Sequence, residues 1–222
     1  FPNCPFEKVV YANMNILRLW GGQYYPQDHF YDKCDEVGIM IWQEFMLSCN
    51  LYPDSDAYLD VLRVEATSII RRLRTHPCLA FWCGGNELCF RGDYMDAEGN
   101  ILKENVEDME GRAYDVHDLI WIPLSPKYPT LAAMEKVVAR LDPKKKRLHT
   151  SGSGPIIQNA DLRYLGGAMH DVHGPWGYVG AYRHYEFYDN SNSIVHGEFG
   201  CGGISGMDQI RRIFKPEDRK LF

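Results

Sequence analysis

The sequence predicts an α/β fold with a parallel sheet, because short apolar runs alternate with amphipathic segments along most of its 222 residues. Nearly every apolar run ends on polar or aromatic residues, and no glycine-rich phosphate loop follows a predicted strand. A parallel sheet whose chemistry gathers at the carboxyl ends of its strands is typical of the (β/α)8 TIM barrel. We therefore predict this barrel in preference to a doubly wound nucleotide-binding sheet.

Strands and helices alternate through the first part of the chain. The run "MNILRLW" (14–20) predicts a strand buried on both faces, and the apolar residues of the next segment (26–38) recur at helical spacing. The run "IMIWQEF" (39–45) predicts a second strand. A long amphipathic helix is expected over 56–74, where a His-Pro pair follows it, and "CLAFWC" (78–83) predicts the third strand.

The second part resumes this alternation after an interruption. A polar stretch rich in Gly, Asp and Asn (about 91–126) is expected to be a loop excursion from a single domain that spans 1–222. Helices are predicted over 130–141 and 207–214. Three further runs predict strands, at 147–152, 167–173 and 193–199.

Charge and composition exclude several classes of partner. With 24 Lys and Arg against 30 Asp and Glu, the net charge is −6, and there is no basic stripe of the kind that binds nucleic acid. No apolar run reaches the ~18 residues that span a membrane. We therefore expect neither nucleic acid nor a membrane as a partner. Because the chain starts at Phe1, it is expected to begin inside a longer protein.

The seven cysteines, an odd number, lie mostly in apolar stretches and are expected to be buried free thiols. Cys78 and Cys83 are five residues apart in a predicted strand, so they point to opposite faces and do not easily share a metal. The same argument applies to His170 and His173, which are three residues apart. No structural zinc is expected.

Two acids stand at the ends of predicted strands. Glu87 follows the third strand and a Gly-Gly pair, and Glu198 lies at the end of the run 193–199. Apolar neighbours at the mouth of a barrel raise the pKa of a carboxyl group, which suits it to donate a proton near neutral pH. Two such carboxyl groups are what acid-assisted cleavage of a glycosidic bond requires. From spacing alone, a solvated loop acid explains each Glu equally well.

Three longer motifs carry more information: "NMNILRLWGGQYYPQDHFYDKCDEVGIMIWQEFMLSCNLYP", "RRLRTHPCLAFWCGGNE" and "HGEFG". Together they resemble the catalytic barrel of family 2 glycoside hydrolases, especially its β-mannosidase-like branch, from about residue 12 to residue 200. The resemblance implies a retaining exo-glycosidase that needs no cofactor and acts on a glycoside or oligosaccharide, with β-mannosides expected first. The alternatives are an endo-acting β-glycanase and a non-catalytic barrel fragment that only binds carbohydrate.

The resemblance implies roles for individual residues. Glu87 corresponds to the general acid/base of the family and Glu198 to its nucleophile, which Arg18 is expected to steady. The residues expected to contact the sugar are Trp20, Glu44, Asn86, His173 and Trp176. A retaining mechanism predicts that the two carboxyl groups lie about 5 to 5.5 Å apart, and we expect Asn86 to face the same cavity.

The residues themselves also allow plainer explanations. A structural ion pair explains Arg18 as well as a catalytic role does, and His173 alone is more typical of a buried histidine with satisfied hydrogen bonds. Trp20 stands beside two glycines at a strand end, which favours a sugar platform over a core position. The chain also departs from the family pattern, because Glu44 replaces the usual Asp and "WCGGNE" replaces "WCGNNE".

The chain is expected to hold an incomplete barrel, because the six predicted strands are fewer than the eight that closure requires. In the family, the motif "NMNILRLW" belongs to the second strand and "HGEFG" to the end of the seventh. The first and eighth strands should therefore lie outside 1–222, and residues 1–11 should be the tail of the first helix or a linker. The resemblance also implies β-sandwich domains before the barrel, in the same protein.

Overall fold

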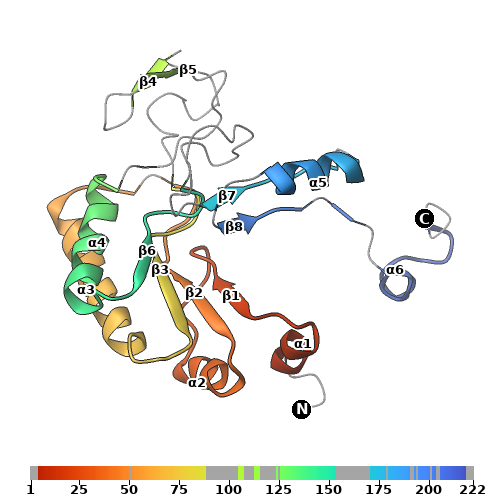
Figure 1. Cartoon of the computed structure of the whole chain (residues 1–222), viewed down its shortest axis with the longest axis horizontal. Helices are drawn as coiled ribbons and strands as arrows, with labels where there is room; N and C mark the ends of the chain where they lie inside the picture. Colours follow the sequence, from red (N-terminus) through yellow and green to blue (C-terminus); the bar gives the residue numbers. More distant parts are fainter. Residues whose placement is uncertain are drawn as a thin grey trace.

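The computed structural model describes residues 5–50, 52–88, 105–107, 113–115, 124, 126–153, 171–178, 180–190, 193, 195–200, 202–203 and 206–218. Four parallel strands form its main sheet, and Figure 1 shows them side by side. Their spatial order is β1 (Ile16–Leu19), β2 (Met40–Glu44), β3 (Leu79–Cys83) and β6 (Lys146–Leu148).

A second parallel ladder joins β7 (Asp171–His173) to β8 (Val195–Glu198). The backbone N–H of Ser153, just beyond β6, donates to the carbonyl of Asp171 at 2.9 Å and so connects the two ladders. An antiparallel hairpin of β4 (Asn105–Glu107) and β5 (Ala113–Asp115) lies within the predicted excursion at 91–126.

The predicted α/β fold with a parallel sheet is confirmed. Each of the six predicted strands overlaps an observed strand, although β6 begins one residue before the predicted 147–152 and residues 167–170 of the fifth lie outside the described residues. The observed strands are shorter than the predicted ones, because several apolar runs continue into the loops that follow.

Three helices pack on one face of the main sheet, and local sequence sets their ends. Helix α2 (Asp28–Val37) ends at Gly38, whose φ of 75° favours glycine. Helix α3 (Asp56–Leu73) begins after Ser55, whose hydroxyl accepts a hydrogen bond from the N–H of Tyr58. Helix α4 (Pro129–Leu141) has proline at its first position, where the missing N–H costs nothing.

The remaining helices lie at the two ends of the described chain. Helix α1 (Pro5–Tyr11) matches the helical alternative predicted for residues 1–11, and its Phe6 ring lies 5.3 Å from that of Phe30. Helix α6 (Met207–Ile213) falls within the predicted 207–214. Helix α5 (Ala181–Asn190) was not predicted, because its sequence carries no continuous apolar stripe.

The main sheet is buried on both faces. On the face toward the helices, the core includes Ile41, Ile70, Leu79 and Trp82. The opposite face carries a separate cluster of Trp42, Phe81, Cys83 and Leu148. Such double burial explains why the strands are continuous apolar runs without alternation. Cys78 and Cys83 belong to the two different clusters, as predicted from their spacing.

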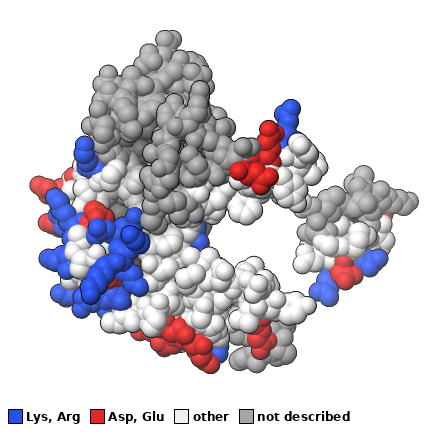
Figure 2. Space-filling model, in the orientation of Figure 1, with Lys and Arg blue, Asp and Glu red and all other residues white. Residues whose placement is uncertain are grey.

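Figure 2 shows many Lys and Arg side chains over α3 and α4, on the outer side of the sheet. The exposed cations of this region include Arg71, Arg74, Lys136 and Arg140. Acidic residues are interspersed there, since Asp60 pairs with Arg63 at 2.6 Å. No helix of the described part is sufficiently long and apolar to span a membrane.

Replacing Ile70 with Ala should lower the free energy of unfolding by about 2–5 kcal/mol, because its fully buried side chain would leave a cavity between α3 and the sheet. The matched control is Val64→Ala, on the same helix but 70% exposed, which should change stability by no more than about 0.5 kcal/mol. Urea denaturation of the intact protein measures both. Equal effects of the two substitutions would contradict the assigned burial.

Candidate active site

An open cavity of about 540 Å³ lies at the carboxyl ends of the strands. Its lining comes from three separate strand ends and the loop after β2: Arg18, Trp20, Cys49, Asn86, Glu87, Gly197 and Glu198. The volume lies within the range of small-molecule sites. Five residues predicted for the site therefore line one cavity, namely Arg18, Trp20, Asn86, Glu87 and Glu198.

The Gly-Gly pair lets the end of β3 approach its neighbours closely. A Cβ on Gly84 would lie 2.0 Å from the carbonyl oxygen of His149, and one on Gly85 would lie 2.6 Å from that of Leu47. Beyond the pair, Asn86 forms parallel bridges to both neighbouring segments. Glu87 then adopts a φ of 45°, a rare conformation for a residue with a side chain, which ends the strand at the cavity.

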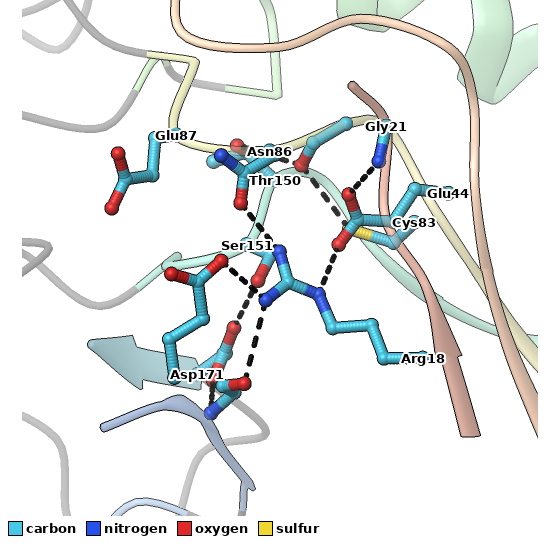
Figure 3. A network of polar contacts seen from close by, with 12 residues as sticks. Arg18, Gly21, Glu44, Cys83, Asn86, Glu87, Thr150, Ser151 and Asp171 are labelled. Atoms are coloured by element: carbon cyan, nitrogen blue, oxygen red, sulfur yellow. Dashed lines mark hydrogen bonds and ion pairs between the residues drawn. The ribbon is translucent and has the colours of Figure 1, made fainter. Parts of the chain in front are cut away.

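The Arg18 guanidinium is the centre of the polar network in Figure 3. Its Nε donates to Glu44 Oε1 at 2.6 Å, and its two terminal nitrogens donate to Glu198 Oε1 and Asn86 Oδ1 at 2.5 Å each. The guanidinium also lies 4.9 Å from the centre of the Trp42 ring. Burial alone would lower the pKa of Arg18, but the charges of Glu44 and Glu198 outweigh it and hold the pKa above its usual range. Arg18 is therefore a fixed cation.

Glu44 lies beneath Arg18 and is fully buried. One carboxylate oxygen accepts from Arg18, and the other accepts from the N–H of Gly21 at 2.7 Å. Burial raises the pKa of Glu44, and both of these contacts oppose the rise. The resemblance implied a sugar contact for Glu44, but it is not among the described residues that line the cavity. Its position instead supports Arg18.

His173 lies between the two candidate acids. Its Nδ1 is 2.9 Å from Glu87 Oε1 and 3.9 Å from Glu198 Oε2. Oxygen atoms of the two glutamates and a ring nitrogen of His173 all lie within 4.8 Å of one another. His173 is fully buried, and its Nδ1 side faces the acids themselves.

The other ring nitrogen of His173 meets a buried polar pair. Its Nε2 lies 2.8 Å from Ser151 Oγ and 3.4 Å from Asp171 Oδ2. Burial alone would lower the pKa of His173, but hydrogen bonds to Asp171 and Glu87 outweigh it and raise the pKa to about 9. The carboxylates around His173 thus favour its protonated, cationic form.

Asn86 and Cys49 form the wall next to Glu87. Asn86 Nδ2 donates to Cys49 Sγ at 3.3 Å, while Cys49 Sγ lies 3.7 Å from Glu87 Oε2. The Cys34, Cys78 and Cys83 thiols are free and buried, as predicted, whereas Cys49 is only partly buried.

Two tryptophans lie toward the outside of the site. Trp20 lines the cavity and is 42% exposed. Trp176 is 43% exposed, and its ring meets that of His173 edge to face with the centres 6.3 Å apart. Trp20 therefore offers accessible aromatic surface at the cavity, and Trp176 offers it beside His173.

Asp171, Ser151 and Cys49 were missed as site residues. Asp171 could have been found, because it stands two residues before His173 in a predicted strand and so shares its face. Ser151 belongs to a "SGSGP" segment that looks like an ordinary loop, and Cys49 reached the cavity through a loop conformation with φ of 53°. Neither position carries a local signal.

Two clusters among the described residues have the composition of a metal site. One is Glu87, His173 and Glu198. The other is Asp35, His76 and Cys78, at the amino-terminal end of β3. In the second cluster, Asp35 already accepts from the N–H of Cys78 at 2.6 Å and contacts His76 Nδ1 at 2.7 Å. Through these contacts the Asp35 carboxylate connects the end of α2 to the start of β3.

Comparisons with known proteins relate the chain to β-mannosidases, although no family model matches it. The Bos taurus β-mannosidase is 54% identical over 104 residues, which are 46% of this chain and 12% of that protein. The β-mannosidase B of Aspergillus terreus is 30% identical over 217 residues, which are 96% of this chain and 24% of that protein. The chain thus spans a quarter or less of the length of these relatives.

Solved structures agree. The β-D-mannosidase of Dictyoglomus thermophilum matches 96% of this chain and 23% of its own, with a TM-score of 0.66 and 28% identity. The exo-chitosanase of Amycolatopsis orientalis matches 96% of this chain and 21% of its own, with a TM-score of 0.54 and 17% identity, which shows a shared fold alone. These likenesses place the chain among the glycoside hydrolases. The resemblance to family 2 of that class, in its β-mannosidase-like branch, is thereby confirmed.

Replacing Arg18 with Met should lower the free energy of unfolding by about 3–5 kcal/mol, because it leaves the fully buried Glu44 without its cation. Adding Glu44→Gln to this variant should recover part of the loss. Arg63→Met is the control, since its pair with Asp60 is exposed and should be worth less than about 1 kcal/mol. Denaturant unfolding measures all three, and a loss at Arg18 no larger than at Arg63 would show that the buried pair is unimportant.

Proposed function

We propose that the protein containing this chain is a retaining exo-β-mannosidase, with Glu198 as the nucleophile and Glu87 as the general acid/base. The observation that carries the proposal is the meeting of the two carboxyl groups at one cavity, with oxygen atoms within 4.8 Å of each other. The names of the relatives point to terminal β-linked mannose as the substrate.

In the first step, Glu198 attacks the anomeric carbon while Glu87 gives a proton to the leaving oxygen. Arg18 holds Glu198 Oε1 at 2.5 Å, so Oε2 is the oxygen left to attack. In the second step, Glu87 takes a proton from water, which then hydrolyses the ester on Glu198. These steps require no cofactor.

The separation of the carboxyl groups supports retention over inversion. Retaining enzymes hold them about 5–5.5 Å apart, whereas inverting enzymes leave roughly 6.5–9.5 Å for a water molecule. Oxygen atoms of Glu87 and Glu198 within 4.8 Å of one another fit the shorter of these two separations better. Direct attack by Glu198 is therefore the mechanism that the distance favours.

Side chains around the acids suit the binding of one sugar. We assign Trp20 and Trp176 to the walls of the sugar subsite, because Trp20 lines the cavity and Trp176 is exposed beside His173, which contacts both acids. Asn86 lines the cavity and is placed to meet the hydroxyl next to the anomeric carbon. We assign Glu44 and His173 to the support of Arg18 and Glu87 in place of direct sugar binding.

The chain fits a partial (β/α)8 barrel that is completed by strands outside residues 1–222. β1 ends the described main sheet, and apolar side chains on it or just before it are exposed: Met14 and Ile16 at 51% and 38%. A first strand paired with β1 would cover them. We also propose that β-sandwich domains of the same protein precede the barrel and help to wall the cavity, since the relatives are about four times as long as this chain.

The proposed roles of the two acids predict different responses to substitution in the intact protein. Glu198→Ala should abolish turnover of every nitrophenyl glycoside, because no covalent intermediate can form. Glu87→Ala should slow a phenyl β-mannoside by about 10²–10⁴-fold but largely spare a dinitrophenyl one, whose leaving group needs no proton. Azide should then restore turnover of Glu87→Ala as β-mannosyl azide. Release of the opposite anomer would mean that the roles are reversed.

Substrate class is tested by a panel of nitrophenyl glycosides together with polymeric β-mannan. Fast release from the β-mannoside and negligible cleavage of the polymer are expected. Cleavage of the polymer alone would support an endo-acting glycanase, and binding without turnover would support a carbohydrate-binding barrel.

Expression of residues 1–222 alone should give a poorly soluble and inactive product. The exposed apolar edge of β1 and the open interior of a partial barrel would favour aggregation. Activity per mole and light scattering of this segment are compared with those of the intact protein. Full activity from the segment would contradict the partial barrel.

A further inference from the structure

A continuous chain of hydrogen bonds runs from Glu87 into the buried interior. His173 Nδ1 lies 2.9 Å from Glu87 Oε1, and His173 Nε2 lies 2.8 Å from Ser151 Oγ. Ser151 Oγ donates to Asp171 Oδ2 at 2.6 Å, and Asp171 Oδ1 accepts from the N–H of Gly197 at 2.5 Å. Ser151, Asp171 and His173 are all fully buried, so water does not compete for these contacts.

The chemistry of Asp171 sets the direction of these bonds. A carboxylate only accepts, so the Ser151 hydroxyl must donate to it and turn a lone pair toward His173. The Nε2 of His173 must then carry a hydrogen. When Glu87 is a carboxylate, it too only accepts, so Nδ1 of His173 must also donate. A histidine that donates from both nitrogens is an imidazolium cation.

We propose that Asp171 and Ser151 are positioning residues that keep His173 doubly protonated, so that its cation stabilises the carboxylate that Glu87 becomes when it gives its proton to the leaving oxygen. This inference rests on the acid/base role proposed for Glu87. The proton passes from Glu87 to the leaving oxygen as that oxygen takes the electron pair of the broken bond. It returns to Glu87 from water in the second step, while His173 keeps both of its protons throughout.

Several charged groups face His173, and each of them affects how the protonation of His173 depends on pH. Glu87 approaches from the end of β3, and Glu198 on β8 lies 3.9 Å from Nδ1. Arg18 offsets the charge of Glu198, and that of Glu44, through direct contacts. Asp171, by contrast, has no Arg or Lys among its described contacts. Its negative charge therefore acts mainly on His173.

The decisive variant is Asp171→Asn in the intact protein. An amide keeps the acceptor for Gly197, but its NH₂ would donate to Ser151, whose hydroxyl would then donate to Nε2 and leave His173 neutral. Loss of a cation beside Glu87 should raise its pKa by about 1–3 units, since a nearby opposite charge lowers a carboxyl pKa by that amount. The basic limb of the profile of kcat/KM against pH reports the acid of the free enzyme, so it should move upward.

Two further variants accompany this measurement with a phenyl β-mannoside. Ser151→Ala should move the basic limb in the same direction but less far. It removes the hydroxyl between His173 and Asp171, but Nε2 of His173 already lies 3.4 Å from Asp171 Oδ2. Ser153→Ala is the matched control, since within the described residues the one bond of Ser153 Oγ is accepted from the backbone N–H of Asp171, at 3.0 Å. Its profile should not move. Reduced activity in Asp171→Asn with an unmoved or lowered basic limb would overturn the proposal.

A second readout does not depend on activity. His173 has a folded-state pKa of about 9, above the ordinary 6.5, so its stabilising charge is complete below pH 6.5 and is lost as pH rises through 9. The decrease in Tm caused by Asp171→Asn should therefore be largest below pH 6.5 and shrink toward pH 9. A constant decrease would overturn the proposal. If the wild-type protein hydrolyses no glycoside but this pH dependence is found, the proposed function fails while the bonding of His173 stands.

Discussion

The contact of Arg18 with Glu44, Asn86 and Glu198 is the interaction on which the rest of the site depends. A guanidinium offers several donors in a fixed plane, and here they reach groups on three different segments of the sheet. Coulombic attraction is strong in this buried setting, but it repays desolvation only when every charge has a partner. Glu44 provides that partner from below, with its second oxygen satisfied by Gly21. Removing any member would leave a buried group unpaired, so the arrangement fixes the geometry of Glu198 as well as the packing of β1 against β2.

The parallel sheet explains how residues so far apart in sequence come together. The carboxyl ends of its strands lie on the same side, and the cavity there is lined by residues at or after the ends of β1, β2 and β3 together with the end of β8. Glycine makes the close approach possible at the end of β3, where a Cβ on Gly84 or Gly85 would collide with neighbouring backbone. The same constraint acts at β8, since a Cβ on Gly197 would lie 2.5 Å from Asp171 Oδ2. The backbone N–H of Gly197 can therefore bond to Asp171, which connects the shape of the chain to the chemistry of His173.

Much of this could be predicted from the sequence, because strand ends are visible as polar residues after apolar runs. Arg18, Glu87 and Glu198 were expected at one edge, and they meet there. How deeply each side chain lies below the cavity was not predictable. Glu44 and His173 follow the same pattern as the other site residues, yet they lie beneath them with their polar atoms already engaged. Asp171 was overlooked although its spacing from His173 placed it on the same face, and Cys49 depended on a loop conformation that no periodicity reveals.

Charge balance connects the two glutamates through His173. In the proposed mechanism the negative charge moves during the reaction, because ester formation neutralises Glu198 as proton transfer makes Glu87 anionic. Nδ1 of His173 lies 2.9 Å from an oxygen of Glu87 and 3.9 Å from one of Glu198, so one cation is near the charge in both states. The described hydrogen bonds from Arg18 to other side chains reach Glu44, Glu198 and Asn86, so Arg18 serves the nucleophile. Arg18 would thus be a fixed cation for the nucleophile, and His173 a cation shared between the nucleophile and the acid. Together they would keep the buried site close to electrical neutrality as the reaction proceeds.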